Sequence, residues 1–150
     1  MAFLPNRPTH PDGLLHGVVA GVRRVDGRWL MIRRSKHVNP YPLRVCFPGG
    51  LVEPGETQPA AVIREMAEEL GVVVRPVRQV WQWDFPDRSG ILWGWFAEIA
   101  SGQLVPNPAE IAEILWLSAA EGSDHPDGVP SNRSFLSCLE AHFIGPARAE

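Results

Sequence analysis

The chain has 150 residues and a formal net charge of −3, and 45% of its residues are hydrophobic. A chain of this length can bury one hydrophobic core, so we expect a single domain over residues 1–150. Its weakly acidic balance excludes the basic footprint of duplex nucleic-acid binding and a polybasic membrane patch. No apolar run reaches signal-peptide length at the start or the ~18 residues of a membrane span, so we expect a cytoplasmic protein.

Apolar-rich runs predict three strands in the first third of the chain. Residues 14–24 and 28–34 are separated by Asp26-Gly27, which is a strong hairpin signal. A third short strand, at 44–47, leads into Pro48-Gly49-Gly50. The two glycines lack a Cβ, so their backbone can approach a metal or a phosphate closely.

The next segment, residues 57–70, has the features of an amphipathic helix. Thr57 is a good N-cap, Pro59 is tolerated in the first turn, and Gly71 suits a left-handed residue at the end. At about 100° per residue the side chains separate into two faces. We expect the apolar face to comprise Val62, Ile63, Met66, Ala67 and Leu70, and the polar face Arg64, Glu65, Glu68 and Glu69.

The second half of the chain predicts more strands and a final helix. Two strands, at 72–85 and 91–100, are joined by a turn at 86–90, and another strand is expected at 113–117. A short turn at 118–121 and a loop at 125–130 follow. The helical spacing of Phe135, Leu136, Leu139 and Phe143 predicts a last helix capped by Ser131.

The carboxylates of the first helix suggest a metal site. Glu65 lies three and four positions before Glu68 and Glu69, so their like charges repel on the helix surface. A divalent cation would reverse the sign of that interaction, and Mg²⁺ or Mn²⁺ suits hard oxygen ligands. The alternative is a solvated polar face, as most charged helix runs are.

The spacing around these carboxylates forms a longer pattern. It reads Gly50, five residues, Glu56, seven residues, Arg64-Glu65-Met66, one residue, Glu68-Glu69, one residue, Gly71-Val72. This pattern reproduces the signature box of the Nudix hydrolases, and on it the chain resembles that family. The resemblance implies an α/β fold, with a mixed β-sheet in an α/β/α sandwich that covers about residues 14–143.

The resemblance also implies an activity, which is hydrolysis of a nucleoside diphosphate linked to another group, with divalent metals. Carried over by position, Glu65 and Glu69 are the principal metal ligands, Glu68 is a third, and the Gly50 carbonyl is a fourth. Arg64 orients a glutamate or contacts phosphate, and Glu56 supports it. Arg64, Glu65 and Glu68 are the expected catalytic residues, and the general base is Glu65 or a glutamate outside the box.

Outside the box we expect Glu110, in preference to Glu113, to add a metal ligand or base, as happens in this region of related Nudix proteins. Arg34 is a candidate substrate contact. Trp81 and Trp83, and Trp93 and Trp95, alternate along two neighbouring strands, so each pair should share a sheet face. Trp83 and Trp95 are candidates for stacking on a nucleobase, and core packing is the alternative.

The substrate is not specified by the box. Damaged or ordinary nucleoside triphosphates rank first, ADP-ribose and other nucleotide sugars second, and coenzyme A third. Residues 30–35 and 47–50 partly resemble coenzyme A pyrophosphatases, but Ile32 replaces their usual threonine.

A second class of function is a regulatory Nudix-like domain that binds a nucleotide metabolite without turnover. The three intact box glutamates favour catalysis. Cys46 and Cys138 are isolated thiols, which we interpret as small buried hydrophobes. The expected partner is a small nucleotide, and the sequence leaves open whether the chain forms a homodimer.

Overall fold

The computed structural model describes residues 10–144, and residues 1–9 and 145–150 of the predicted domain lie outside the described part. Seven strands and three helices follow one another in it. The strands are β1 Leu15–Val22, β2 Trp29–Arg34, β3 Val45–Cys46, β4 Gly49–Leu51, β5 Val73–Asp84, β6 Gly90–Ser101 and β7 Ile111–Leu117. The helices are α1 Gln58–Leu70, α2 Ala119–Ser123 and α3 Asn132–Ile144.

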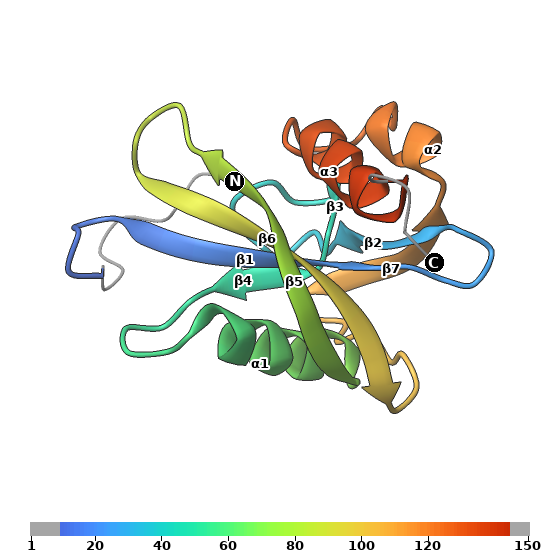
Figure 1. Ribbon diagram of the computed structural model, residues 1–150, viewed down its shortest axis with the longest axis horizontal. Coiled ribbons are helices and arrows are strands. Elements are labelled where there is room, and N and C mark those ends of the chain that lie inside the picture. Colours follow the sequence, from blue (N-terminus) through green and yellow to red (C-terminus); the bar gives the residue numbers. More distant parts are fainter. Residues whose placement is uncertain (1–9, 145–150) are drawn as a thin grey trace.

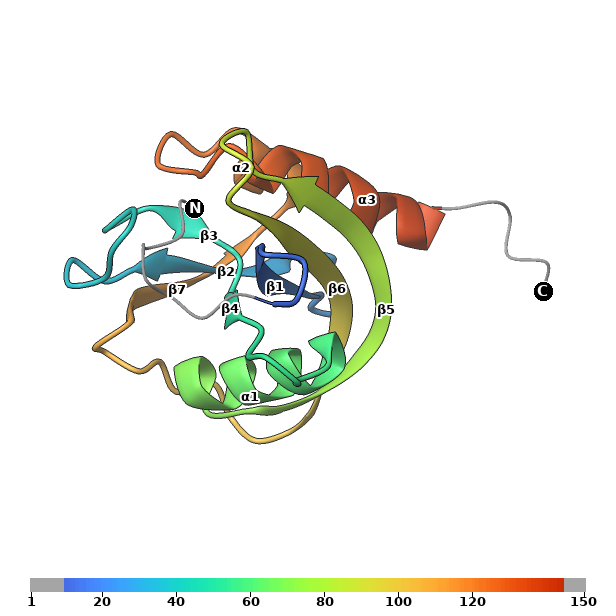
Figure 2. The ribbon, with the colours of Figure 1, turned by 90° about the vertical axis from the view of Figure 1, so that its left-hand side faces the viewer.

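Two sheets form the centre of the structure. One has the order β4-β1-β6-β5 and is mixed, because β1 and β6 are parallel while the other neighbours are antiparallel. The other sheet, β3-β2-β7, is antiparallel. Helix α1 covers one side of the strands, and α2 and α3 cover the other (Figures 1 and 2). The expected mixed α/β sandwich is therefore confirmed.

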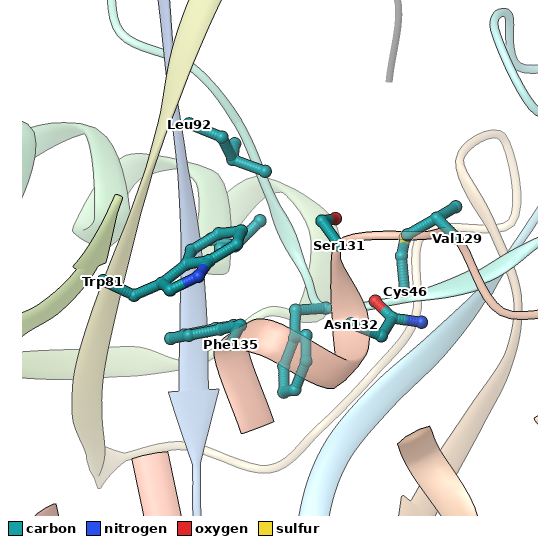
Figure 3. Close-up of a pocket in the computed structure, with 9 residues that line it drawn as sticks. Cys46, Trp81, Leu92, Val129, Ser131, Asn132 and Phe135 are labelled. Atoms are coloured by element: carbon teal, nitrogen blue, oxygen red, sulfur yellow. The ribbon is translucent and has the colours of Figure 1, made fainter. Parts of the chain in front are cut away.

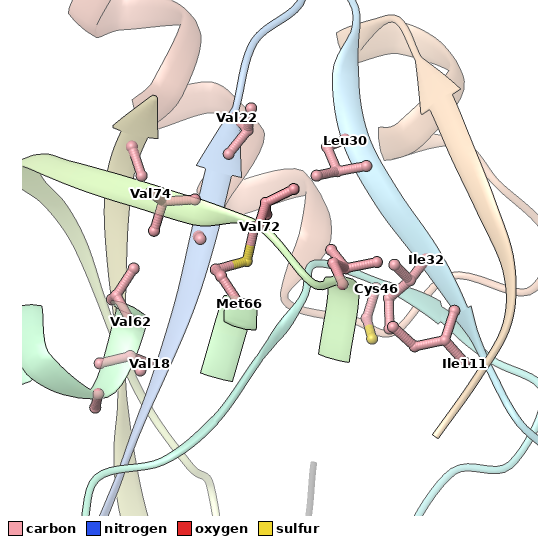
Figure 4. Packing of buried hydrophobic residues seen from close by; sticks show 14 of the residues in the cluster. Val18, Val22, Leu30, Ile32, Cys46, Val62, Met66, Val72, Val74 and Ile111 are labelled. Atoms are coloured by element: carbon pink, nitrogen blue, oxygen red, sulfur yellow. The ribbon is translucent and has the colours of Figure 1, made fainter. Parts of the chain in front are cut away.

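The hydrophobic core has two parts, one beneath each helical layer. Val62, Met66 and Leu70 of α1 pack against β1 and β5 in the first part (Figure 4). Phe135 and Leu139 of α3 belong to the second part, together with Trp29. Two helical layers over two sheets bury the apolar side chains that the strand and helix patterns predicted.

The boundaries of α1 are confirmed, but its buried face is rotated from the expected one. The Thr57 side chain accepts a hydrogen bond from the Ala60 N–H, and Gly71 is left-handed with φ 69°. Ile63, expected in the core, is 41% exposed, whereas Glu69, expected on the polar face, is only 6% exposed. Glu69 faces inward and accepts a hydrogen bond from the Gly49 N–H of the neighbouring β4, while Glu68 stays exposed.

The expected hairpin of residues 14–24 and 28–34 is wrong, because β1 and β2 join different sheets and are bridged only at Arg23 and Trp29. The remaining differences from the expected elements are small. Residues 118–121 begin helix α2, where Ser118 and Glu121 form a reciprocal capping box. The segment from Gly49 pairs with β1 as strand β4, and β7 starts at Ile111. Within residues 10–144, we find no helix with the length and apolar character that a membrane crossing requires.

The N-cap of α1 can be tested by substitution. Replacing Thr57 with Ala removes the acceptor for the Ala60 N–H and should lower the free energy of unfolding by about 1 kcal/mol. Thr57→Ser keeps the hydroxyl and is the matched control. Urea unfolding followed by circular dichroism measures both, and equal stabilities of the two variants would show that the cap contributes nothing.

Candidate active site

Strand β4 lies directly against the carboxylates of α1. Gly50 pairs with Val18 and Gly49 with Val19 of β1, which fixes the β4 backbone. A Cβ on Gly50 would overlap the Glu65 carboxylate, and a Cβ on Gly49 would overlap the Val18 carbonyl oxygen. Position 49 therefore requires glycine because backbone atoms stand in the way, whereas a side chain at position 50 would displace the Glu65 carboxylate.

Arg64 connects most of the acidic groups of the box. Its guanidinium donates two hydrogen bonds of 2.9 Å to the two carboxylate oxygens of Glu56 and one of 2.8 Å to the Leu51 carbonyl. It also donates to Glu65 at 2.8 Å and, more weakly, to Glu68 at 3.4 Å. The Arg64 hydrogen bonds hold the pKa of Glu56 below its ordinary value. Arg64 thus orients Glu65, as expected from the sequence.

Glu69 is the most deeply buried acid of the site. The Gly49 N–H donates to its Oε1 at 2.9 Å. Burial raises the pKa of Glu69 well above its ordinary value, and the nearby charges of Glu65 and Glu110 add to the rise. Burial also raises the pKa of Glu65, against the opposing effect of Arg64. Burial therefore disfavours the ionised forms of both neighbouring carboxylates, although Glu65 has Arg64 as a positive partner.

Glu110 reaches the same acidic group from a separate turn. The Asn107 N–H donates to the Glu69 backbone carbonyl at 2.8 Å, and the Glu110 N–H donates back to the Asn107 carbonyl at 3.0 Å. The Glu110 charge is among the causes that raise the pKa of Glu65 and Glu69. Glu113 instead faces Arg33 at 4.0 Å, across β2 and β7. The structure therefore places Glu110, and not Glu113, beside the box.

The chemistry of these groups fits a divalent cation. Glu65, Glu69 and Glu110 supply hard oxygen donors with excess negative charge, and the missing Cβ of Gly50 lets the Glu65 carboxylate lie close to the β4 backbone. Among residues 10–144, no three acidic, histidine or cysteine side chains already converge as a complete metal-binding group. Arg64 and the Gly49 N–H hold the Glu65 and Glu69 carboxylates, so waters and substrate phosphates would complete the coordination of Mg²⁺.

Next to the acidic group lies a narrow pocket between β1, β6 and the start of α3 (Figure 3). It is lined by Val19, Cys46, Phe47, Trp81, Leu92, Val129, Ser131, Asn132 and Phe135. The pocket lies near the acidic site, because Val19 pairs with Gly49, Phe47 precedes Pro48-Gly49 in the chain, and the Glu69 charge acts on the Cys46 thiol of the lining.

Arg34 lies at the boundary between the pocket and the carboxylates. Burial raises the pKa of the Cys46 thiol to about 11, and the adjacent Arg34 guanidinium opposes that rise. Arg34 also acts on Glu69, where it lowers the pKa. Its Nε donates to the Tyr41 carbonyl at 3.1 Å. This position suits the predicted contact with the substrate, which stays a prediction.

The pocket contains a buried amide that the sequence analysis did not identify. Asn132 is 3% exposed, and its Nδ2 donates to the Val45 carbonyl at 2.9 Å. In the sequence it is only the residue after the expected helix cap, so no pattern marked it. Its partner Val45 belongs to β3, across the pocket from α3, and only the tertiary fold brings them together.

The first tryptophan pair lies on the α3 side of the sheet. Trp81 and Trp83 stack with ring centroids 5.9 Å apart, and Trp81 also stacks on Phe135 at 5.0 Å. The Trp81 indole N–H donates to the Ser134 hydroxyl at 2.8 Å. Trp81 is both a core residue and part of the pocket wall, whereas stacking of Trp83 on a base stays a prediction.

The second pair lies on the α1 side. Trp93 donates to His16 Nδ1 at 3.0 Å, and Trp95 donates to Gln58 Oε1 at 2.9 Å. Both pack against the α1 part of the core. Each pair therefore shares a face as expected, but Trp95 is not brought together with the pocket residues, and its substrate contact stays a prediction.

Comparison with known proteins identifies the family. The NUDIX domain matches residues 14–138. The chain belongs to the Nudix family. It is 28% identical to the 8-oxo-dGTP diphosphatase of Escherichia coli over 125 residues, which cover 82% of this chain and 95% of that protein. It is 37% identical over 87 residues to the NAD-capped RNA hydrolase NudC of Deinococcus radiodurans, covering 58% of this chain.

The matched coverage differs between these relatives. The Nudix chain spans only 31% of the Deinococcus NudC and 35% of the NudC of Stutzerimonas stutzeri. Among solved structures, the E. coli ORF135 protein is 25% identical with a TM-score of 0.71, covering 89% of this chain and 94% of its own. The MutT protein of Methanosarcina mazei, 22% identical with a TM-score of 0.74, covers 87% of this chain and 95% of its own and supports the fold alone.

The raised pKa of Glu69 predicts how metal-free stability depends on pH. A carboxyl group with a raised folded-state pKa favours folding fully at acidic pH and loses that contribution as the pH rises through the folded pKa. Glu69→Gln stays neutral and keeps an acceptor for the Gly49 N–H. In EDTA, the wild-type melting temperature should therefore fall relative to Glu69→Gln as the pH rises above about 4.3, the ordinary pKa of a glutamate.

Thermal unfolding of both proteins across that pH range provides the measurement. Glu98→Gln is the control, because Glu98 forms only an exposed ion pair with Arg75. If the difference in melting temperature between wild type and Glu69→Gln were the same at all pH values, the buried Glu69 carboxylate would not be destabilising.

Proposed function

We propose that this Nudix chain hydrolyses the phosphoanhydride chain of a nucleoside triphosphate, using Mg²⁺ or Mn²⁺ held by the carboxylates of α1. The observation that carries this proposal is the direct connection between the acidic group and the pocket. Cys46 and Phe47 line the pocket, and Gly49 and Gly50 follow at once against Glu69 and Glu65. A base in the pocket would thus place its phosphates toward the metal ligands.

The matched lengths favour a triphosphate as the first substrate to test. The E. coli 8-oxo-dGTP diphosphatase is matched over 95% of its length, whereas the NudC proteins are matched over about a third. An oxidised purine triphosphate therefore ranks above a dinucleotide or a capped RNA. ADP-ribose and coenzyme A stay second and third.

The residues of the site would have different roles in this reaction. Glu65 and Glu69 would hold the cation, with Glu68, Glu110 and the Gly50 carbonyl as further ligands. When bound, Mg²⁺ neutralises phosphate oxygens and lowers the pKa of a water molecule. Arg64 keeps Glu65 oriented through its 2.8 Å hydrogen bond, which is itself fixed by the fork on Glu56.

Hydrolysis requires one proton acceptor. A water oxygen bonds to phosphorus, the bond from phosphorus to the bridging oxygen breaks, and the water proton passes to a carboxylate. Glu65 and Glu110 are the two candidates, because Glu69 is buried and accepts from the Gly49 N–H. The products are a nucleoside monophosphate and pyrophosphate. Arg34, next to Glu69, is positioned to contact the departing phosphates.

A regulatory domain that only binds nucleotide is the competing function. It would not need all the acids of the site, yet Glu65, Glu68 and Glu69 are all present, and Arg64 and β4 position them. An assay of pyrophosphate and phosphate release separates the two functions, since a regulatory domain would bind nucleotides without releasing product.

Activity should depend strictly on a divalent metal and on the box carboxylates. Pyrophosphate and phosphate release is measured across a panel of nucleoside triphosphates, nucleotide sugars and coenzyme A, with Mg²⁺, with Mn²⁺ and with EDTA. We expect triphosphates to be the best substrates, and Glu69→Gln to lower kcat/KM by at least about 10²-fold.

Three further variants test the proton acceptor and provide a control. The variant that removes the general base, either Glu65→Gln or Glu110→Gln, should lower kcat by about 10²–10⁴-fold. Glu113→Gln, a neighbouring acid that faces Arg33, should leave activity unchanged. Turnover in EDTA, or full activity of Glu69→Gln, would contradict the proposed metal site.

Base recognition can be tested at Asn132. Its buried side chain is the amide of the pocket lining. For a base that hydrogen-bonds there, Asn132→Ala should therefore weaken binding by ~1–3 kcal/mol, which lowers kcat/KM about 5- to 150-fold. The preference for purine over pyrimidine triphosphates should fall by the same factor. This ratio is measured on one protein sample, so partial unfolding does not change it. An unchanged ratio would exclude Asn132 from base recognition.

A further inference from the structure

Ser35 is a buried polar residue outside the Nudix box, directly after strand β2, and it is only 3% exposed. Its backbone N–H donates to the Glu110 carbonyl at 2.9 Å, and its hydroxyl donates to the Ala109 carbonyl at 2.9 Å. The same hydroxyl accepts from the His37 N–H at 3.1 Å. Ser35 thus holds the turn that carries Glu110 twice, through its backbone N–H at Glu110 and through its hydroxyl at the adjacent Ala109.

The other side of this turn is fixed to α1. Asn107 donates its N–H to the Glu69 carbonyl at 2.8 Å, and its side-chain oxygen accepts from the Ala109 N–H at 3.1 Å. The turn is therefore held between Glu69 on the box helix and Ser35 at the end of β2. The exposed Glu110 side chain has no rigid packing of its own, so its position depends on these backbone hydrogen bonds.

We propose that Ser35 is a positioning residue, which sets the distance of the Glu110 carboxylate from Glu65 and Glu69 and thereby the affinity of the site for its divalent cation. This inference rests on the proposed function, because it requires Glu110 to be a metal ligand. Groups that orient metal ligands change metal affinity by about 10- to 100-fold when they are removed. Ser35 acts on Glu110 through two adjacent carbonyls.

A competing explanation is that Ser35 acts on the loop that follows it. The His37 N–H binds the Ser35 hydroxyl, and Arg34 binds the Tyr41 carbonyl in the same loop. If that connection dominated, loss of the hydroxyl would change nucleotide binding and leave metal affinity unaltered.

A double-mutant cycle with Mn²⁺ binding as the readout tests the proposal. The affinity of Mn²⁺ alone, without nucleotide, is measured by electron paramagnetic resonance for wild type, Ser35→Ala, Glu110→Gln and the double variant. Ser35→Ala should raise the Kd about 10-fold or more in the wild-type background. It should change the Kd by less than about twofold in the Glu110→Gln background, because the ligand it positions is already lost.

Controls make each outcome informative. Ser35→Cys keeps a small side chain with a weak donor and should give an intermediate Kd, so it replaces Ser35→Ala if that variant does not fold. Glu113→Gln should bind Mn²⁺ as the wild type does. Equal effects of Ser35→Ala in both backgrounds, or a wild-type Kd in Ser35→Ala, would overturn the positioning role.

The cycle also separates this inference from the proposed function. If Glu110→Gln binds Mn²⁺ with wild-type affinity, the positioning role is overturned, while loss of activity in Glu69→Gln would still support metal-dependent hydrolysis. If Glu69→Gln and Glu65→Gln retain full activity, the proposed function fails regardless of the cycle.

Discussion

The packing of two carboxylates against a glycine backbone is the constraint on which the rest of the site depends. Glu69 is buried with one backbone donor, the Gly49 N–H, and Glu65 lies where a Cβ on Gly50 would be. Burial raises the pKa of both acids, and the hydrogen bond from Arg64 offsets that effect at Glu65 only in part, so the charged forms of both are disfavoured. This unfavourable free energy arises at the junction of β4 and α1, where a bound cation would offset it.

Arg64 holds the acidic side chains of the box in defined positions. It is bound on one side to Glu56 and the Leu51 carbonyl and on the other side to Glu65. Because the Glu56 fork fixes the guanidinium plane, the hydrogen bond to Glu65 has a defined direction. The box is therefore a positioned set of oxygens, in which one arginine sets the direction of the ligand that a cation would need.

The sequence predicted the parts of the structure that local patterns control. The caps at Thr57 and Gly71, the β5–β6 hairpin and the last helix follow from hydrogen-bonding and periodicity rules, and the box marked Arg64 and Glu69. The Asp26-Gly27 signal predicted a hairpin of β1 and β2 wrongly, because the fold assigns these strands to separate sheets. The rotation of α1 was predicted wrongly, because hydrophobicity alone placed Ile63 inside. The pocket amide was missed, because Asn132 meets Val45 only through the packing of α3 on the short sheet.

The tryptophans also show that a local sequence pattern does not determine which tertiary neighbours a strand has. Alternation correctly assigned each pair to one face, but it cannot say which face borders the site. Trp81 stacks on Phe135 of α3 and lines the pocket, while Trp95 donates to Gln58 of α1. The side of the sheet on which each helix packs, which is a tertiary property, decides between these roles.

The most direct test of the account is the number of protons released when a divalent cation binds. Isothermal titration with Mn²⁺ in buffers of different ionisation enthalpy measures that number as a function of pH. If Glu69 and Glu65 carry raised pKa values and become ligands, binding should release protons at mildly acidic pH, and the release should decline toward zero as the pH rises. Glu69→Gln should reduce the release. Binding without proton release at any pH, or no saturable binding, would contradict the account.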